Sequence, residues 1–260
     1  MIGIWYALVI VLASAVGAVS GMGGGVLIKP IFDTIGAHPI TQIGFFSSVA
    51  VFVMSIVSTW RQVKSGNRIK TGILLPIAGG AILGGLVGNG VFNWFVSWFS
   101  TPGQVTLIQI ILTLLTLIFA LWASKNPDLS FDLNSFIYYT LCGFILGFLA
   151  SFLGIGGGPI NVSLLMLMFA FPIKQATVYS IGIIFFSQLA KLVSIALSGA
   201  YLTFDLPILW YVVPAAIVGG LLGAKLSNIL SPKQVQVLFQ VIILVVMLIN
   251  IYNAWRLVIL

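Results

Sequence analysis

The sequence predicts an all-α polytopic membrane protein made of two inverted structural repeats, and three observations lead to this fold class. The chain has 260 residues, of which 60% are hydrophobic and only 6% are charged, and its mean hydropathy is +1.21. Its apolar runs, such as 73–99, 105–123 and 235–251, approach or exceed the ~20 residues that cross a hydrocarbon core as a helix. Finally, the two halves of the chain share a series of motifs in the same order.

The composition excludes other fold classes. Soluble domains carry roughly 25% charged residues, far more than this chain does. An outer-membrane barrel would show alternating segments of about ten residues, whereas these apolar runs are continuous. The first apolar run lacks the basic region that precedes it in a signal peptide, so we treat it as part of the fold. The single cysteine, Cys142, permits no intrachain disulfide.

The shared motifs indicate an internal duplication. The run "GMGGG" from Gly21 corresponds to "GIGGG" from Gly154, an offset of 133 residues, which is the difference between 154 and 21. At the same offset "HPITQ" corresponds to "FPIKQ", and further on "GGLVG" corresponds to "GGLLG". We therefore expect a first repeat over residues 1–123, a polar linker over 124–134 and a second repeat over 135–260.

Each half contains five apolar segments. In chain order they cover about 3–20, 23–36, 41–60, 71–97 and 103–123 in the first half, and about 135–152, 156–170, 174–197, 206–228 and 233–254 in the second. The second segment of each half has only ~15 residues, fewer than a full span needs. We expect it to be a half-helix that dips into the membrane, and we allow for a break in the first segment as well.

The basic residues predict the orientation of the segments, since cytoplasmic loops are enriched in Lys and Arg. The loop "RQVKSGNRIK" holds four basic residues, whereas its counterpart "SGAYLTFD" in the second half holds none. Corresponding loops therefore face opposite sides, and both termini face outward. This assignment places eight basic residues inside (61, 64, 68, 70, 125, 174, 225 and 233), Arg256 outside, and Lys29 and Lys191 within segments.

The two GxGGG runs are the strongest candidates for a functional site. Glycine costs ~1 kcal/mol relative to alanine in a helix, so each run breaks its helix. The helix that follows begins with unpaired N–H groups, which favour an anion, and exposed backbone at membrane depth must be buried in protein or line a cavity. We interpret both runs as cavity-lining, substrate-binding positions: Gly23, Gly24, Gly25, Gly156, Gly157 and Gly158.

Glycines can instead pack helices closely. We favour that interpretation for the "GGLVG" and "GGLLG" motifs, which contain Gly84, Gly85, Gly88, Gly219, Gly220 and Gly223.

Ionisable side chains inside the apolar segments are functional candidates by default. Lys29 follows the first glycine run, and Asp33 lies one helical turn further on, so the two can form an ion pair. Lys191 is the most isolated basic residue of the membrane region and can balance the charge of a substrate, although a lysine can also reach the membrane surface. Asn161 stands where the first half has Ile28, so the halves differ chemically.

Polar residues of the third segments complete the candidate substrate-binding set. These are Gln42 and Ser47 in the first half and Gln175 and Ser180 in the second, for each of which hydrogen bonding between helices is an equal alternative. His38 is the only histidine and lies in an expected outer loop, where histidines are usually solvated. His38 and Asp33 are the candidates for proton coupling.

The glycine break in each half, the following "HPITQ" and "FPIKQ" motifs and the duplication of a chain of this length resemble the sulfite exporter TauE/SafE family of membrane permeases. The resemblance covers nearly the whole chain. It implies secondary transport of a sulfur-containing anion, such as sulfite or a sulfonate like sulfoacetate, outward across the bacterial inner membrane. Only the glycine runs and the Pro and Gln positions are taken from the resemblance; Lys29 and Lys191 are inferred from the sequence itself.

We therefore expect a secondary exporter of a small sulfur-containing oxyanion that works by alternating access between the inverted repeats. The first alternative is an anion or small-solute channel, which needs a continuous pore with polar or basic rings. A membrane enzyme is disfavoured because the chain has one His, one Cys and no Glu, and a partner subunit would leave the glycine breaks without a purpose. We expect no cofactor, no metal site and no nucleic acid; the partners are the anion, the lipid bilayer and, as an open alternative, further copies of the chain.

Overall fold

The structure is a computed structural model that describes residues 2–64, 70–99, 102–126 and 129–259. Within these ranges every regular element is helical. The first half contains α1 (Ile2–Ser20), α2 (Gly25–Ile35), α3 (Ile40–Lys64), α4 (Thr71–Trp98) and α5 (Pro102–Lys125). The second half contains α6 (Phe136–Phe152), α7 (Pro159–Phe169), α8 (Ile173–Leu197), the short 3-10 helices η1 (Ala200–Thr203) and η2 (Leu206–Ile208), α9 (Leu209–Ile229) and α10 (Pro232–Ile259).

The ten helices coincide with the ten predicted segments to within a few residues at each end. In the described part of the chain, seven of them are long and apolar enough to cross a membrane: α1, α3, α4, α5, α8, α9 and α10. The predicted fold class, an all-helical polytopic membrane protein, is confirmed. The chain is an integral, multi-pass membrane protein.

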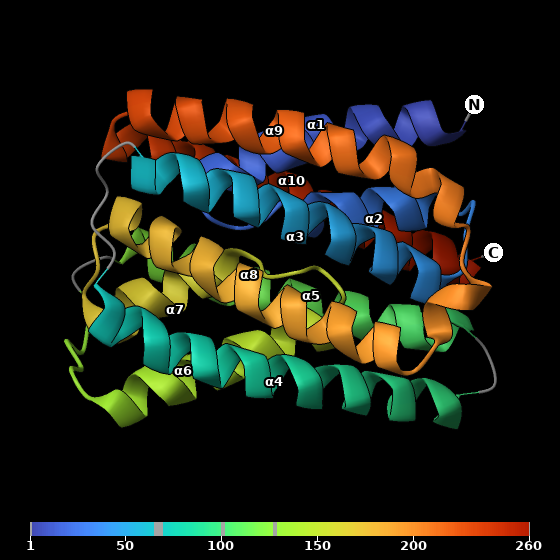
Figure 1. Cartoon of the computed structure of the whole chain (residues 1–260), viewed down its shortest axis with the longest axis horizontal. Coiled ribbons are helices and arrows are strands. Elements are labelled where there is room, and N and C mark those ends of the chain that lie inside the picture. Colours follow the sequence, from blue (N-terminus) through green and yellow to red (C-terminus); the bar gives the residue numbers. More distant parts are fainter. Residues whose placement is uncertain (1, 65–69, 100–101, 127–128, 260) are drawn as a thin grey trace.

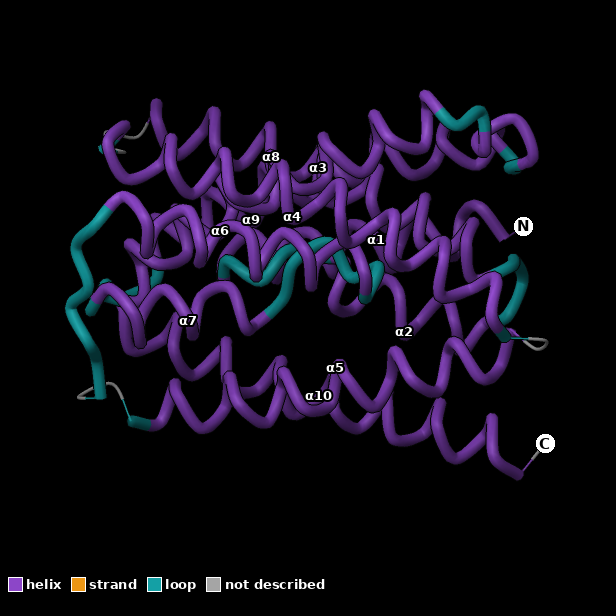
Figure 2. The backbone as a smooth tube through the Cα atoms, turned by 90° about the horizontal axis from the view of Figure 1, so that it is seen from below, coloured by secondary structure: helices purple, strands orange, loops and turns teal. Residues whose placement is uncertain are grey.

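The bundle has two distinct ends. Both chain termini lie at one end, which we call the terminal end, and residues 129–135 lie at the opposite end, which we call the linker end (Figure 1). The helices α2 and α7 have 11 residues each. At 1.5 Å per residue each is ~16 Å long, about half of the hydrocarbon thickness. Figure 2 shows α2 toward the terminal end and α7 toward the linker end. The predicted half-helices are therefore present, and α1 and α6 run without a break up to the glycine runs.

All seven tryptophans are exposed and lie near helix ends. At the terminal end they belong to the starts of α1 and α9 and to the ends of α4 and α10; at the linker end they belong to the ends of α3 and α5 (Trp5, Trp210, Trp94, Trp98, Trp255, Trp60 and Trp122). Tryptophan rings gather at both membrane–water interfaces. The two groups therefore match the two faces of a bilayer that the long helices cross.

Glycines allow the tightest helix pairs of the bundle. In α4, a Cβ on Gly84 would overlap the backbone of Phe144 in α6, and Gly88 packs in the same way on Phe148. In α9, Gly219 and Gly223 pack on the backbone of α1. The motif partners Gly85 and Gly220 face the backbones of α8 and α3. The interpretation of "GGLVG" and "GGLLG" as packing motifs is confirmed.

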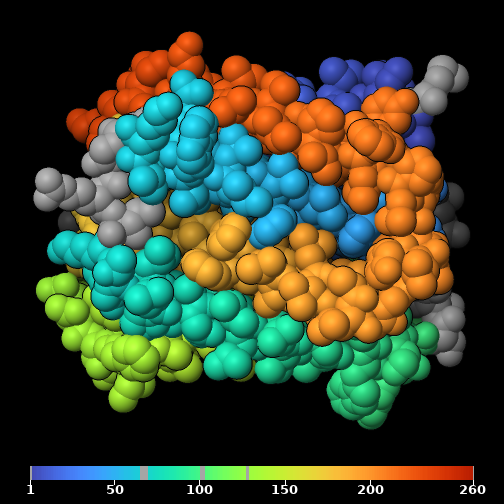
Figure 3. Space-filling view, in the orientation of Figure 1, coloured from blue at the N-terminus to red at the C-terminus, as the bar shows by residue number. Residues whose placement is uncertain are grey.

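The helices of the two halves have matching partners. The helix α4 packs along α6 as α9 packs along α1, and α3 packs on α9 as α8 packs on α4. The helices α3 and α8 contact each other and lie side by side in the middle of one face of the molecule, flanked by α9 and α4 (Figure 3). This arrangement is what a duplication requires; the inverted relation of the repeats stays a prediction.

Candidate functional site

The two glycine runs form loops at the middle of the molecule, between α1 and α2 and between α6 and α7 (Figure 2). The helix α1 ends at Ser20 because Gly21 adopts a φ of +72°, and Gly154 adopts +68° just after α6. Residues with a Cβ rarely take such backbone conformations, whereas glycine takes them at little cost. The predicted break of a helix at each GxGGG run is confirmed.

The two loops contact each other. A Cβ on Gly25 would overlap the carbonyl oxygen of Ile155, so only glycine fits there. Gly23 also faces the second loop, because its ideal Cβ position lies 3.4 Å from the carbonyl oxygen of Gly156. Backbone from both halves of the chain therefore meets at the centre without intervening side chains.

The other predicted glycines line the same centre. Gly24 precedes α2 and packs on the backbone of Ser14 in α1. Gly157 has a φ of +121°, and its ideal Cβ position lies 3.3 Å from the Nδ2 atom of Asn161. Gly158 precedes Pro159, the first residue of α7. In the described part of the chain neither α2 nor α7 has a capping side chain at its start.

The third helix of each half contacts both glycine loops. Val51 in α3 lies against Gly23 and Gly156, and Ile184 in α8 lies against Gly23 and Gly157. Both apolar side chains are fully buried. Together they close the centre of the molecule at the level of the two loops.

Lys29 and Asp33 form an ion pair within α2. The Nζ atom of Lys29 donates to the Oδ2 atom of Asp33 at 2.8 Å, and the side chains are 5% and 10% exposed. The aliphatic stem of Lys29 lies over the second glycine loop, since its Cε atom is 3.3 Å from the ideal Cβ position of Gly154. The pairing expected from their spacing of one helical turn is therefore present, and it lies beside the glycine break.

Lys191 lies near the same glycine break, but among the described residues it has no acidic partner. It is 4% exposed, and its Nζ atom lies 3.9 Å from the ideal Cβ position of Gly44 in α3. The Cα atom of Gly44 in turn lies 4.0 Å from the ideal Cβ position of Gly154. Within the described residues Lys191 makes no hydrogen bond or ion pair. We call Lys29, Asp33, Gly44, Gly154 and Lys191 the lysine cluster.

With both lysines protonated, the lysine cluster carries a net positive charge, because two ammonium groups then face one carboxylate. It lies on the terminal side of the centre, since Lys29 is in the second turn of α2, which runs from the centre toward the terminal end (Figure 2). Through the offset of 133 residues, Lys29 corresponds to Val162 in the second half. Lys191 corresponds to Ser58 in the first half. The equivalent place on the linker side is therefore uncharged.

Other predicted polar residues lie around the glycine loops. Ser180 donates to the carbonyl oxygen of Gly21 and so satisfies the broken end of α1. Ser47 faces Gly25, and its hydroxyl has no hydrogen-bond partner among the described residues. Asn161 is fully buried, and within the same ranges neither its Oδ1 nor its Nδ2 atom has a partner. Ser180 thus has a structural bond, whereas Ser47 and Asn161 have unused polar atoms.

Gln42 and Gln175 do not join this centre. Gln42 starts α3 at the terminal end, where its Nε2 atom donates to the carbonyl oxygen of Thr203 at 3.4 Å. Gln175 starts α8 and lines a cavity at the linker end. The predicted inversion itself contained this information, because it places the starts of the two third segments on opposite sides.

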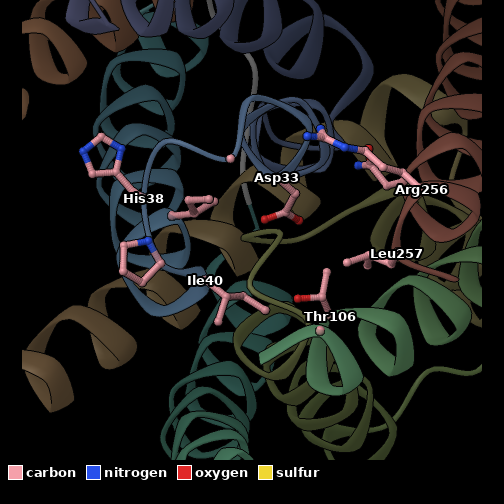
Figure 4. Close-up of a pocket in the computed structure, with 11 residues that line it drawn as sticks. Asp33, His38, Ile40, Thr106, Arg256 and Leu257 are labelled. Atoms are coloured by element: carbon pink, nitrogen blue, oxygen red, sulfur yellow. The ribbon is translucent and has the colours of Figure 1, made fainter. Parts of the chain in front are cut away.

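A cavity of about 430 Å³ opens at the terminal end. Asp33 from α2, Thr106 from α5 and Arg256 from α10 surround it (Figure 4). The Nη1 atom of Arg256 donates to the carbonyl oxygen of Thr34 at 2.6 Å. His38 also lines the cavity, but its side chain is only 11% exposed and its Nδ1 atom lies 2.9 Å from the hydroxyl of Tyr6. The ring of His38 is therefore only partly exposed, because it also packs against the aromatic rings of Tyr6 and Phe46.

A second cavity, of about 420 Å³, opens at the linker end. It is lined by the starts of α4, α6 and α8, the end of α7 and the linker, and its polar side chains include Lys70, Asp132, Asn134, Tyr139 and Gln175. The glycine loops with Val51 and Ile184 lie between the two cavities. In the described part of the chain no three His, Cys, Asp or Glu side chains gather in a way that could hold a metal ion.

Sequence reasoning missed Gly44, Val51, Ile184 and Arg256. Gly44 gave a signal, since it is a glycine inside a helix that needs no break, two residues after Gln42. Val51 and Ile184 occupy corresponding positions of the repeats, at the offset of 133, but apolar residues are ordinary in membrane helices. Their role at the centre follows from their contacts alone.

Comparison with known proteins gives two kinds of match. A protein-family model described as "Sulfite exporter TauE/SafE" matches residues 6–249. The chain is 28% identical to YunE of Bacillus subtilis, a probable membrane transporter protein, over 90% of this chain and 92% of that one. It is 29% identical to a probable membrane transporter protein of Methanocaldococcus jannaschii, over 87% of each chain. No solved structure matches the chain.

Proposed function

This chain belongs to the sulfite exporter TauE/SafE family of membrane transporters, and we propose that it exports a small sulfur-containing oxyanion, such as sulfite or a sulfoacetate-like organosulfonate. Transport would proceed by alternating access between two inverted repeats. That the chain is a membrane transporter follows from the family and from the two relatives. The oxyanion and the mechanism are proposals, supported by the geometry of the lysine cluster.

The observation that carries the proposal is the ammonium of Lys191, which has no partner in the part of the chain that the structure describes. A charge in the interior of a membrane protein is costly unless it is paired or hydrogen-bonded. Among the described residues Asp33 forms an ion pair with Lys29 only, so with both lysines protonated the cluster has one positive charge left for a ligand. A small oxyanion supplies the missing negative charge, and it supplies several oxygen atoms that accept hydrogen bonds from ammonium groups.

The surrounding polar groups fit an oxyanion as well. The starts of α2 and α7 lie at the centre without capping side chains, and helix starts favour anions through their free N–H groups and their dipole. The hydroxyl of Ser47 and the amide of Asn161 are buried donors without partners in the described residues. In this proposal the lysines balance the charge, and these groups contact the oxygen atoms of the anion.

Two cavities at opposite ends favour a carrier over a channel. They are lined by different residues, and the glycine loops with the buried side chains of Val51 and Ile184 lie between them. A channel needs one continuous pore with polar or basic rings, whereas alternating access needs a barrier between two openings. The channel alternative predicts flux that does not saturate and shows no countertransport.

The distribution of basic residues supports an orientation. Arg61, Lys64, Lys70, Lys125, Lys174, Lys225 and Lys233 lie near helix ends that Figure 1 places at the linker end. The eighth basic residue assigned to the inside, Arg68, lies outside the described residues. By the positive-inside rule the linker end faces the cytoplasm, so both termini face outward across the cell's inner membrane.

We propose no enzymatic role for the chain. For energy coupling, Asp33 and His38 are the candidate proton carriers, because both line the terminal-end cavity. Crosslinking in membranes tests whether further copies of the chain assemble with it.

The test is flux in proteoliposomes that contain the purified full chain. We expect saturable transport of labelled sulfite or sulfoacetate that is accelerated by unlabelled anion on the opposite side. Lys191→Met should reduce this flux by about tenfold or more, because it removes a full charge at close range. The control is Lys225→Met, which removes an exposed lysine at the linker end. Equal flux in wild type and Lys191→Met would contradict the site, and absence of flux for both anions would contradict the proposed substrate.

A further inference from the structure

Asp33 is the residue of the lysine cluster that also lines the terminal-end cavity. Its Oδ2 atom accepts the hydrogen bond of Lys29 at 2.8 Å, and the residue also lines the cavity together with Arg256 (Figure 4). An anion held by Lys29 and Lys191 would thus have one carboxylate as its nearest charged neighbour on the terminal side. This carboxylate changes how much negative charge the cluster can neutralise.

The count of charges is simple because the cluster contains two cations and one anion. With all three groups ionised, a monovalent ligand brings the total to zero. A divalent ligand leaves one uncompensated negative charge in a buried, low-dielectric place, which is costly. Without the carboxylate, the two ammonium groups would match a divalent ligand instead.

We propose that Asp33 determines the charge of the transported anion, making the site selective for monovalent over divalent oxyanions. The inference rests on the function proposed above and deepens it, since among the anions named there it favours the monovalent form of sulfite, hydrogen sulfite, over divalent sulfoacetate. Asp33 acts here through its negative charge and through its hydrogen bond with Lys29, and it does not itself bind the anion.

The size of the effect follows from the geometry. Asp33 lies one hydrogen bond beyond the Nζ atom of Lys29, so its charge is ~6–8 Å from an anion on the other side of that ammonium. A unit charge at this distance changes the affinity of a monovalent anion by about 30- to 100-fold at an effective dielectric of ~20. A divalent anion responds about twice as strongly on the free-energy scale, because the interaction is proportional to its charge.

The experiment compares methanesulfonate, which is monovalent, with sulfoacetate, which is divalent and carries the same sulfonate group. The binding of each is measured by calorimetry on the purified full chain in detergent. In Asp33→Asn the ratio of the two dissociation constants should shift toward sulfoacetate by roughly tenfold or more. The control is Asp205→Asn, which removes an acid 48% exposed near His38, and it should leave the ratio unchanged.

A double variant separates charge from structure. Lys29→Met with Asp33→Asn removes one cation and one anion, so the cluster keeps the net charge of the wild type. Because Lys29 lies closer to the anion than Asp33 does, the charge rule expects the ratio to return to the wild-type value or to pass it toward methanesulfonate. If Asp33→Asn shifts the ratio and the double variant does not reverse the shift, the shift is structural and the inference is overturned.

Lys191→Met keeps the inference testable if Asp33→Asn does not fold. That variant lowers the net charge by one, so sulfoacetate should lose about tenfold more affinity than methanesulfonate; equal losses would overturn the charge rule. Failure of the inference differs from failure of the proposed function. Wild type that binds both sulfonates, with a ratio that Asp33→Asn leaves unchanged, overturns the inference alone. Wild type that binds neither sulfonate and does not transport sulfite contradicts the function on which it rests.

Discussion

Gly44→Ala tests whether the space between Lys191 and the second glycine loop holds the anion. Gly44 lies inside α3, and the only described atom within 4 Å of its ideal Cβ position is the Nζ atom of Lys191, at 3.9 Å. This distance is an ordinary van der Waals contact. The new methyl group therefore fits the empty protein, and the folded state is not strained by it.

We expect Gly44→Ala to raise the stability of the protein and to lower its affinity for the anion. Alanine in place of a helical glycine stabilises by up to ~1 kcal/mol. An oxyanion oxygen bound to Lys191 would lie ~2.8 Å from Nζ. The new methyl carbon would lie 3.9 Å from the same Nζ atom, so an oxygen on the side of the ammonium that faces Gly44 would overlap it. Forcing extra atoms into a filled site costs roughly 1–3 kcal/mol, so we expect the apparent anion affinity to fall by about tenfold or more.

The assay pairs thermal unfolding in detergent with concentration-dependent flux in proteoliposomes. Gly44→Ala should unfold at the same or a higher temperature than wild type while its KM for the anion rises. The matched control is Gly90→Ala in α4, where nothing lies within 4 Å of the ideal Cβ position; it should gain stability and leave the KM unchanged. A Gly44→Ala protein that is stable and transports with the wild-type KM would refute the placement of the anion beside Lys191.

Two further substitutions test the packing of the glycine loops. Gly25→Ala should destabilise by roughly 1–3 kcal/mol or prevent folding, because the Cβ overlaps the carbonyl oxygen of Ile155; thermal unfolding measures it, and Gly79→Ala, which meets no neighbouring atom, is its control. An unchanged unfolding temperature for Gly25→Ala would contradict the close approach of the two loops. Ser180→Ala should lower stability by about 1–3 kcal/mol, because the buried carbonyl of Gly21 loses its donor. Full stability in that variant would mean that the hydroxyl is dispensable.

Some predicted features depended only on local sequence, and these agree with the structure. The ten apolar segments became helices because a backbone in hydrocarbon must satisfy its own hydrogen bonds. The helices end at Gly21 and Gly154 because glycine can take positive φ there. The Lys29–Asp33 pair formed because residues four apart lie on one face of a helix.

Features that join distant parts of the chain were harder to predict from the sequence. Gln42 and Gln175 were grouped with the central site because they occupy matching positions, yet they lie at opposite ends. Ser180 has the structural hydrogen bond that was its alternative interpretation. In both cases the repeat gave the correspondence between residues, and the helix directions and contacts decided the location.

By itself, the sequence determined the membrane class, the order and limits of the helices and the two breaks, because each depends on hydropathy or glycine content along the chain. Only the tertiary structure decided that both third helices contact both glycine loops, and that Lys191 lies beside Gly44 while Asp33 forms its ion pair with Lys29. The physical reason is that the net charge of the lysine cluster depends on side chains from two helices, Lys29 and Asp33 from α2 and Lys191 from α8. Their positions are fixed by how the helices pack, which no local pattern specifies.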